Sequence, residues 1–266
     1  MSTPAPIPTL RGVTRAMFES EIRPRAAPVV LQGLVADWPL VRAARESPAE
    51  LARAIKALDA GRVPYVVEAP PASGGRLFYR DDLSGFNFTR QPVAIGDFLD
   101  RLLGFADADV APALYLESLP TGPYLPKFAA AHPLPLLDAR VEPRIWIGNA
   151  IVTPAHYDNS RNLACVVAGR RRFTLFPPEQ IDNLHVGPID FAPAGPCISL
   201  VDFADPDHAR FPRFRAAFEH ARAAELGPGD AIYIPTGWWH HVVSLDVCNV
   251  LVNYWWTADS VHSRRQ

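Results

Sequence analysis

The sequence has little cysteine, almost no lysine and no long apolar run. Its three cysteines, Cys165, Cys197 and Cys248, form no CxxC pair and are too few for a disulfide framework, which favours a reducing, cytoplasmic location. No segment approaches the roughly 18 apolar residues of a membrane-spanning helix. The first residues also lack the apolar stretch of a signal peptide. We therefore expect neither a disulfide-rich secreted protein nor a membrane partner.

An excess of charge of one sign is also lacking. The formal net charge is -2 over 266 residues, so nucleic acid is not expected as a partner. Lysine occurs only as Lys56 and Lys127, and 24 of the 26 basic residues are arginine. Because this bias runs through the whole chain, an arginine at a position where lysine is customary carries little meaning by itself.

The order of predicted elements indicates one domain with two parts. Residues 1–13 are rich in proline and are expected to be loose, and a single domain is expected over residues 14–266. Residues 14–142 alternate between helical patterns, as at 14–22, 47–60 and 95–105, and short strands, as at 27–35, 63–69, 76–80 and 113–119. The helix at 47–60 opens with a Ser47 cap, Pro48 in the first turn and Glu50 three residues after the cap.

From residue 143 the sequence consists of short β-rich segments separated by glycine, proline and asparagine. Such a pattern favours a β-sandwich or barrel over residues 143–257. The predicted fold class is thus mainly β with an α/β part at the N-terminal side.

A histidine and an aspartate stand two residues apart in "TPAHYDNSRN", at His156 and Asp158. Alternate residues of a strand face the same side, so the imidazole and the carboxylate converge if the segment is extended. One further imidazole would complete a two-histidine, one-carboxylate set, which suits Fe(II) and leaves positions open for other ligands. The spacing of His156 and Asp158 alone is also compatible with a chance occurrence or a surface turn.

The second imidazole is offered by "GDAIYIPTGWWHHVV", which contains His240 and His241. The two rings face opposite ways in a strand, so at most one of them joins His156 and Asp158. A backbone carbonyl could satisfy a buried histidine equally well. The same alternation directs one ring of each pair, Trp238/Trp239 and Trp255/Trp256, inward to wall the metal and the other outward.

Longer segments carry a family resemblance. "TPAHYDNSRNLACVVAGRRRFTLFPPEQ", "GPGDAIYIPTGWWHHVVSL" and "VNYWW" follow one another in order. They resemble the JmjC/cupin-like Fe(II)- and 2-oxoglutarate-dependent oxygenases, in particular the branch with the asparaginyl hydroxylase of hypoxia-inducible factor and its bacterial cupin-like relatives. The resemblance extends over roughly residues 14–257 and implies a double-stranded β-helix, or jelly-roll, core.

The resemblance also implies the roles of individual residues. Fe(II) would be bound by His156, Asp158 and His240. The family places a lysine two residues after a glycine to bind 2-oxoglutarate, and here Arg171 follows Gly169 at that spacing. The remaining contacts to 2-oxoglutarate would come from Thr153, Tyr115, Asn162 and Asn253, although a β-former or a core aromatic is also ordinary at the first two positions.

Trp255 and Glu117 correspond to the family's substrate-side positions. A carboxylate at position 117 would favour a cationic or hydrogen-bond-donating target, unless Glu117 pairs with one of the arginines.

The implied activity is hydroxylation, with O₂ as co-reactant, of a side chain of a protein or peptide. The alternatives are the same chemistry on a small molecule, a tRNA base or an N-methyl-lysine, or a cupin-fold binding module without turnover. The sequence favours a protein or peptide over a small molecule as substrate and leaves the oligomeric state open.

Overall fold

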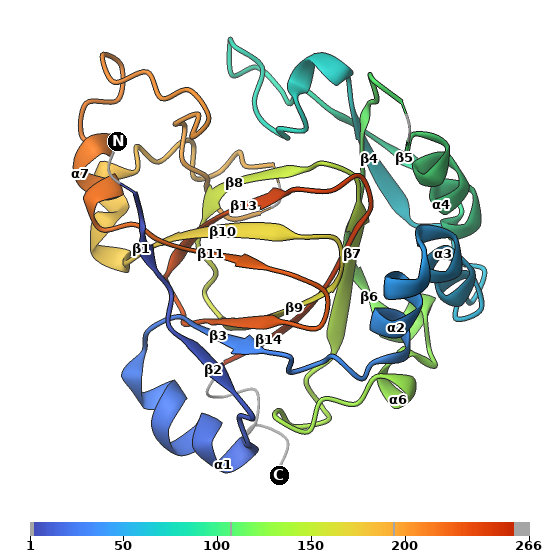
Figure 1. Cartoon of the computed structure of the whole chain (residues 1–266). Coiled ribbons are helices and arrows are strands. Elements are labelled where there is room, and N and C mark those ends of the chain that lie inside the picture. The colour runs from blue at the N-terminus through green and yellow to red at the C-terminus, as the bar shows by residue number, and fades with distance from the viewer. Residues whose placement is uncertain (1–2, 107, 194, 258–266) are drawn as a thin grey trace.

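Two β-sheets face one another and form the centre of the molecule (Figure 1). The computed structural model describes residues 3–106, 108–193 and 195–257. The smaller sheet has the strand order β1 (Ala5–Pro6), β11 (Arg222–Leu226), β10 (Arg171–Phe176), β13 (Trp239–Ser244) and β8 (Val152–His156). This mainly β architecture confirms the fold class predicted from the sequence.

The larger sheet carries nine strands. Their order is β2 (Thr9–Arg11), β3 (Val29–Gln32), β12 (Ala231–Ile234), β9 (Arg161–Ala168), β14 (Asn249–Trp256), β7 (Pro143–Gly148), β6 (Ala113–Pro120), β4 (Tyr65–Ala69) and β5 (Thr89–Pro92). From β7 to β10 and again from β11 to β14, each strand lies in the sheet opposite to the strand before it. This winding between two sheets is that of a jelly-roll core.

Strand β7 shows how the sequence pattern directs side chains. Ile145 and Ile147 are fully buried in the apolar core on the outer face of the larger sheet, whereas Arg144 and Trp146 point to the opposite face. Strand β9 is buried on both faces. A strand covered on both sides reads as a continuous apolar run, as "NLACVVA" does.

Helices α2 (Pro39–Glu46), α3 (Pro48–Lys56) and α4 (Ile95–Gly104) cover the outer face of the larger sheet (Figure 1). The predicted cap of α3 is confirmed, because the Ser47 hydroxyl accepts a hydrogen bond from the Glu50 N–H at 3.1 Å. The short helices are α1 (Arg15–Met17), which continues as a π-turn at Phe18–Ile22 and a 3-10 turn at Arg23–Arg25, α5 (Thr121–Tyr124), α6 (Phe128–Ala131), α7 (Phe214–Glu219) and the 3-10 turns Pro71–Ser73 and Pro178–Asn183.

Two local expectations were wrong. The N-terminal segment, expected to be loose, supplies β1 and β2, which pair in parallel with β11 and β3. Its Ile7 is only 4% exposed and packs between the sheets, and short edge strands tolerate the neighbouring prolines. The segment at residues 76–80, expected to be a strand, forms only isolated bridges, from Arg76 to Val152 and from Tyr79 to Phe86.

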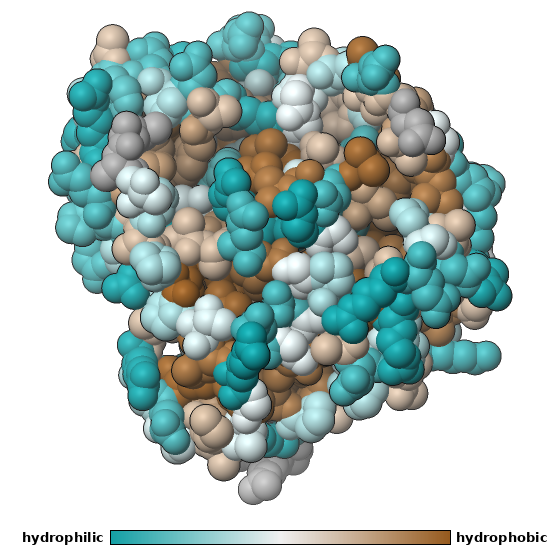
Figure 2. Space-filling view, in the orientation of Figure 1, coloured by the Kyte–Doolittle hydropathy of each residue, from teal (hydrophilic) through white to brown (hydrophobic). Residues whose placement is uncertain are grey.

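Within the described ranges, every helix is too short or too polar to cross a lipid bilayer. On the face drawn in Figure 2, apolar residues lie in separate patches among hydrophilic ones.

Candidate active site

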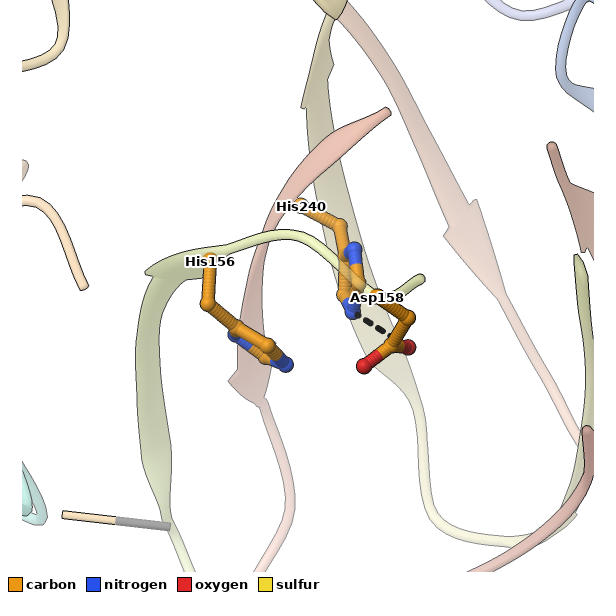
Figure 3. A group of neighbouring side chains, drawn as sticks. All are labelled: His156, Asp158 and His240. Carbon is orange, nitrogen blue, oxygen red and sulfur yellow. Dashed lines mark ion pairs between the residues drawn. The ribbon is translucent and has the colours of Figure 1, made fainter. Parts of the chain in front are cut away.

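His156, Asp158 and His240 come together between the two sheets (Figure 3). Strands β8 and β13 are neighbours, and His156 lies directly opposite His240 in their register. One ligand atom from each of the three residues lies within 4.8 Å of the others, and the two imidazole centroids are 4.2 Å apart. Across the part of the chain that the structure describes, this is the only cluster of three or more such groups that could hold a metal ion.

Backbone carbonyls orient both imidazoles. The Nδ1 atom of His156 lies 2.9 Å from the carbonyl oxygen of Pro154, and Nδ1 of His240 lies 3.1 Å from that of Trp238. A carbonyl can only accept, so each Nδ1 carries the proton and each Nε2 keeps its lone pair for a ligand. Burial, helped by the neighbouring imidazole, lowers the pKa of His240 to about 4. The ring is therefore neutral at pH 7, as a metal ligand must be.

A chain of side-chain hydrogen bonds holds the Asp158 carboxylate. Its Oδ2 accepts from the Trp255 indole N–H at 3.0 Å and from the Asn162 amide at 3.3 Å. Asn162 in turn accepts from the Asn253 amide at 2.7 Å. The other carboxylate oxygen, Oδ1, has no hydrogen-bond partner among the described residues and is available to an ion. Asn162 and Asn253 thus act through Asp158 in this structure.

The adjacent His241 faces away from this cluster. Its ring stacks on Phe203, with centroids 4.4 Å apart and planes at 22°. Burial lowers the pKa of His241 to about 3. The structure therefore brings His240 rather than His241 to His156 and Asp158.

All of the site residues proposed from the sequence line one cavity of about 670 Å³. They are Tyr115, Glu117, Thr153, His156, Asp158, Asn162, Arg171, His240, Asn253 and Trp255. The cavity also includes Arg90, Ser118, Arg144 and Trp146, which sequence reasoning missed. For Arg144 and Trp146 a signal existed, because they alternate with isoleucines in "RIWIG". No comparable signal marks Arg90.

Arg171 is a buried cation with unsatisfied donors. It is 2% exposed, and its Nε and Nη2 atoms have no hydrogen-bond partner in the described structure. The Tyr115 hydroxyl lies close to the Arg171 guanidinium and the Thr153 hydroxyl. Burial lowers the pKa of Arg171 and raises that of Tyr115. A buried guanidinium without an acidic partner fits a carboxylate ligand in the cavity.

The turn between β9 and β10 places Arg171 in the cavity. Gly169 has a φ of 69°, a conformation that other residues rarely adopt. A Cβ at Gly169 would also lie 2.3 Å from Oδ1 of Asn249 and 2.6 Å from the Cys248 carbonyl oxygen. Both the conformation and the space therefore require glycine two residues before Arg171.

Glu117 is paired within the protein. Its carboxylate lies 3.2 Å from the Arg90 guanidinium, which also donates to the carbonyl of Pro193 at 2.7 Å. Burial raises the pKa of Glu117, and Arg90 opposes this shift. Of the two arrangements left open by the sequence, the structure has the ion pair.

The two tryptophan pairs, Trp238/Trp239 and Trp255/Trp256, differ in whether one of their rings faces the cavity. Trp255 lines the cavity, while Trp256 packs on the other face against Tyr233 and Phe18. Neither member of the other pair walls the metal cluster, contrary to expectation. Trp238 donates to the carbonyl of Ala26, and Trp239 is buried in a separate apolar cluster with Phe176.

Several known proteins are similar to a part of the chain that is less than half of its length. The human HSPB1-associated protein 1 is 37% identical over 126 residues, which are 47% of this chain and 25% of that protein. The lysine-specific demethylase JMJ31 of Arabidopsis thaliana is 35% identical over 115 residues, 43% of this chain and 20% of that protein. The JmjC domain-containing protein D of Dictyostelium discoideum is 37% identical over 108 residues, 40% of this chain and 23% of that protein.

These alignments span a quarter or less of each relative's length. The cupin-like domain family matches residues 14–262. Because that match includes nearly the whole chain, the protein belongs to the cupin-like domain family, whose JmjC-type members are in general Fe(II)- and 2-oxoglutarate-dependent oxygenases.

Proposed function

We propose that the protein is an Fe(II)- and 2-oxoglutarate-dependent oxygenase that hydroxylates a side chain of a protein or peptide. This proposal rests on one observation: a cluster of potential metal ligands and a buried cation lie in the same cavity. The His156, Asp158 and His240 cluster lies there together with Arg171, a buried arginine that has no acidic partner in the described part of the chain. A metal centre and a carboxylate-binding group are the two requirements of this chemistry.

The donor set fits Fe(II). His156 and His240 would bind it through Nε2, and Asp158 through Oδ1, which accepts no hydrogen bond from the residues that the structure describes. Two imidazoles and one carboxylate leave further positions open. When bound, Fe(II) supplies the oxidation of an unactivated C–H bond by O₂, coupled to the conversion of 2-oxoglutarate to succinate and CO₂.

The residues of the chain would bind 2-oxoglutarate, orient the metal ligand Asp158 and exclude water from the cavity. Arg171 would pair with the distal carboxylate of 2-oxoglutarate, and Thr153 and Tyr115 would add hydroxyl groups beside it. Trp255 and Asn162 would fix the orientation of Asp158. Apolar side chains on both sheets line the remaining wall and limit the access of water: Phe173, Ile234, Val242 and Leu251.

A protein or peptide substrate is supported by the cavity and by the relatives. A cavity of about 670 Å³ leaves room beside 2-oxoglutarate for an amino-acid side chain. One relative is named for its association with another protein and another for demethylation of lysine. The first name refers to a protein partner and the second to lysine, an amino acid of proteins, which favours a protein or peptide over a small molecule for this chain.

The decisive experiment measures succinate formed from 2-oxoglutarate in the presence of Fe(II), O₂ and a cell extract. We expect Asp158→Ala to abolish succinate formation, because it removes the charged ligand. Asp97→Ala, which removes an exposed carboxylate on α4, is the matched control and should retain activity. Mass spectrometry of extract proteins should then show a gain of one oxygen that depends on Asp158. Full activity of Asp158→Ala would refute the proposal.

Demethylation of N-methyl-lysine is a second candidate, favoured by the name of the Arabidopsis relative. Hydroxylation of an N-methyl carbon gives an unstable product that releases formaldehyde. Formation of formaldehyde in an amount equal to that of succinate, together with a decrease of 14 mass units in a methyl-lysine peptide, would establish demethylation in place of stable hydroxylation.

A further inference from the structure

Arg144 is a second cation of the cavity, and it too lacks an acidic partner among the described residues. It lies on β7, is partly exposed and lines the cavity wall. Its Nε donates to the Ser118 hydroxyl at 2.7 Å, and Nη2 donates to the Ser118 carbonyl at 2.6 Å. A guanidinium has five N–H donors, so most of those of Arg144 have no acceptor among the described residues. They are free to bind a ligand.

An irregularity in β6 holds this arginine in place. The register of β6 with β7 shifts between Leu116 and Leu119, and Ser118 adopts a left-handed φ of 48°. A bulge of this kind re-aims side chains next to functional sites. Here both Glu117 and Ser118 face the cavity. A left-handed serine costs free energy and persists only where its surroundings hold it, and both oxygens of Ser118 bind Arg144.

Arg144 lies at the metal end of the cavity rather than beside Arg171. In the register of β7 and β14 it is opposite Asn253, two residues before Trp255, whose indole binds Asp158. Tyr115, the partner of Arg171, is instead opposite Gly148, four residues and roughly 13 Å away along β7. Arg144 is therefore not a second ligand for the carboxylate that Arg171 would bind.

The charges leave Arg144 uncompensated. Glu117 is occupied by Arg90, so the physical basis for a preference for cationic targets is removed. Bound Fe(II), Asp158, Arg171 and the 2-oxoglutarate dianion together sum to no net charge. The buried Trp146 indole N–H, from a residue of the same wall, also has no acceptor among the described residues. A loaded site thus presents one cation, Arg144, that has no acidic partner among the described residues.

We propose that Arg144 is a substrate-specificity residue that binds a carboxylate of the target peptide, an Asp or Glu side chain at or next to the oxidised residue. This inference rests on the proposed function for its peptide substrate. Arg144 would form charge-assisted hydrogen bonds through its free N–H groups, and Ser118 would hold the guanidinium in position for them.

Binding without turnover tests this inference. The protein is loaded with Mn(II) and 2-oxoglutarate under nitrogen and mixed with an equimolar pool of capped nonapeptides. These have randomised flanks and a central Asp, Glu, Asn, Gln or Lys, and the retained peptides are quantified by mass spectrometry. We expect acid-centred peptides to exceed their amide isosteres about tenfold, as for a charge-assisted hydrogen bond, and lysine-centred peptides to be depleted.

Three variants separate the specific effect from loss of charge or fold. Arg144→Gln should reduce the acid-to-amide ratio to about one, and Arg144→Lys should retain a reduced preference. Arg215→Gln, which removes an exposed arginine on α7, should keep the full ratio. Thermal stabilisation by 2-oxoglutarate in each variant shows that the site is folded.

The inference is overturned if the native protein retains acidic and amide peptides equally, prefers lysine, or retains no peptide, or if Arg144→Gln keeps the preference. Absence of succinate formation would instead refute the proposed function alone, because the retention assay involves no turnover.

Discussion

Replacing Arg171 with methionine should make the ligand-free protein more stable while removing its response to 2-oxoglutarate. Arg171 is 2% exposed, and two of its nitrogens have no partner in the described structure. Without a carboxylate ligand, the folded state therefore carries a buried charge that has no acidic partner among the described residues and lies beside the Tyr115 hydroxyl. Methionine keeps much of the side-chain volume without the charge.

The magnitude follows from the unsatisfied atoms. Each buried donor left without a partner costs roughly 1–3 kcal/mol. The lost polar contact with the Tyr115 hydroxyl offsets about 1 kcal/mol of that gain. We expect Arg171→Met to raise the free energy of unfolding by about 2 kcal/mol, which corresponds to a rise in Tm of about 5 °C for a domain of this size.

Thermal unfolding in Tris chloride with Mn(II), with and without 2-oxoglutarate, provides the assay. At a ligand concentration of about 100 Kd, the native protein should gain about 2.7 kcal/mol, whereas Arg171→Met should gain almost nothing. The control is Arg172→Met, because Arg172 points outward from the same strand and pairs with Glu225 on the surface. It should change stability by less than about 0.5 kcal/mol and retain the full response to 2-oxoglutarate.

Two results would refute this reasoning. If ligand-free Arg171→Met is less stable than the native protein by more than about 1 kcal/mol, the guanidinium is satisfied in the folded state. If the variant still gains stability from 2-oxoglutarate, another cation binds the carboxylate.

Two further predictions concern single side chains. Trp255→Phe removes the indole donor from Asp158 and should weaken Mn(II) binding about tenfold by calorimetric titration, whereas Trp256→Phe, on the opposite face, should leave that affinity unchanged. Equal affinities would show that Trp255 does not position the carboxylate. Because burial lowers the pKa of His241 to about 3, the unfolded state binds its proton first as the pH falls below about 6.5, and stability is lost in that range. From pH 7 to pH 5 the loss in the free energy of unfolding due to His241 amounts to about 2 kcal/mol. His241→Gln should therefore lose about 2 kcal/mol less than the native protein over this pH range, as measured by urea unfolding, whereas His220→Gln, at an exposed position, should lose as much as the native protein. An equal loss in His241→Gln and the native protein would contradict the assignment.

The metal cluster could be predicted from the sequence because its determinants are local. His156 and Asp158 are two residues apart next to the end of a strand, so the face that they share is fixed by the alternation of side chains. The choice between His240 and His241 is also binary. What the sequence could not supply is the pairing of β8 with β13, which places His156 opposite His240 across 84 residues of chain.

The orientation of the tryptophans shows where alternation alone fails. Trp255 and Trp256 lie within the regular strand β14, and one ring faces the cavity as expected. Trp238 precedes β13, after the turn at Pro235–Gly237, and its indole is directed by a hydrogen bond to Ala26. A partner more than 200 residues away in the sequence decides this rotamer, and no local pattern encodes it.

The substrate side of the cavity was the least predictable part for a related reason. Glu117 lines the cavity, yet its charge is neutralised by Arg90 from β5, a strand that the sequence pattern did not indicate. Arg144 becomes available because a bulge turns Ser118 towards it. A one-residue shift of register exchanges the two faces of a strand, so the sign of the charge offered to a substrate depends here on a backbone irregularity. We therefore expect substrate preference in related chains to follow the bulge and the residue opposite it more closely than the identity of residue 117 alone.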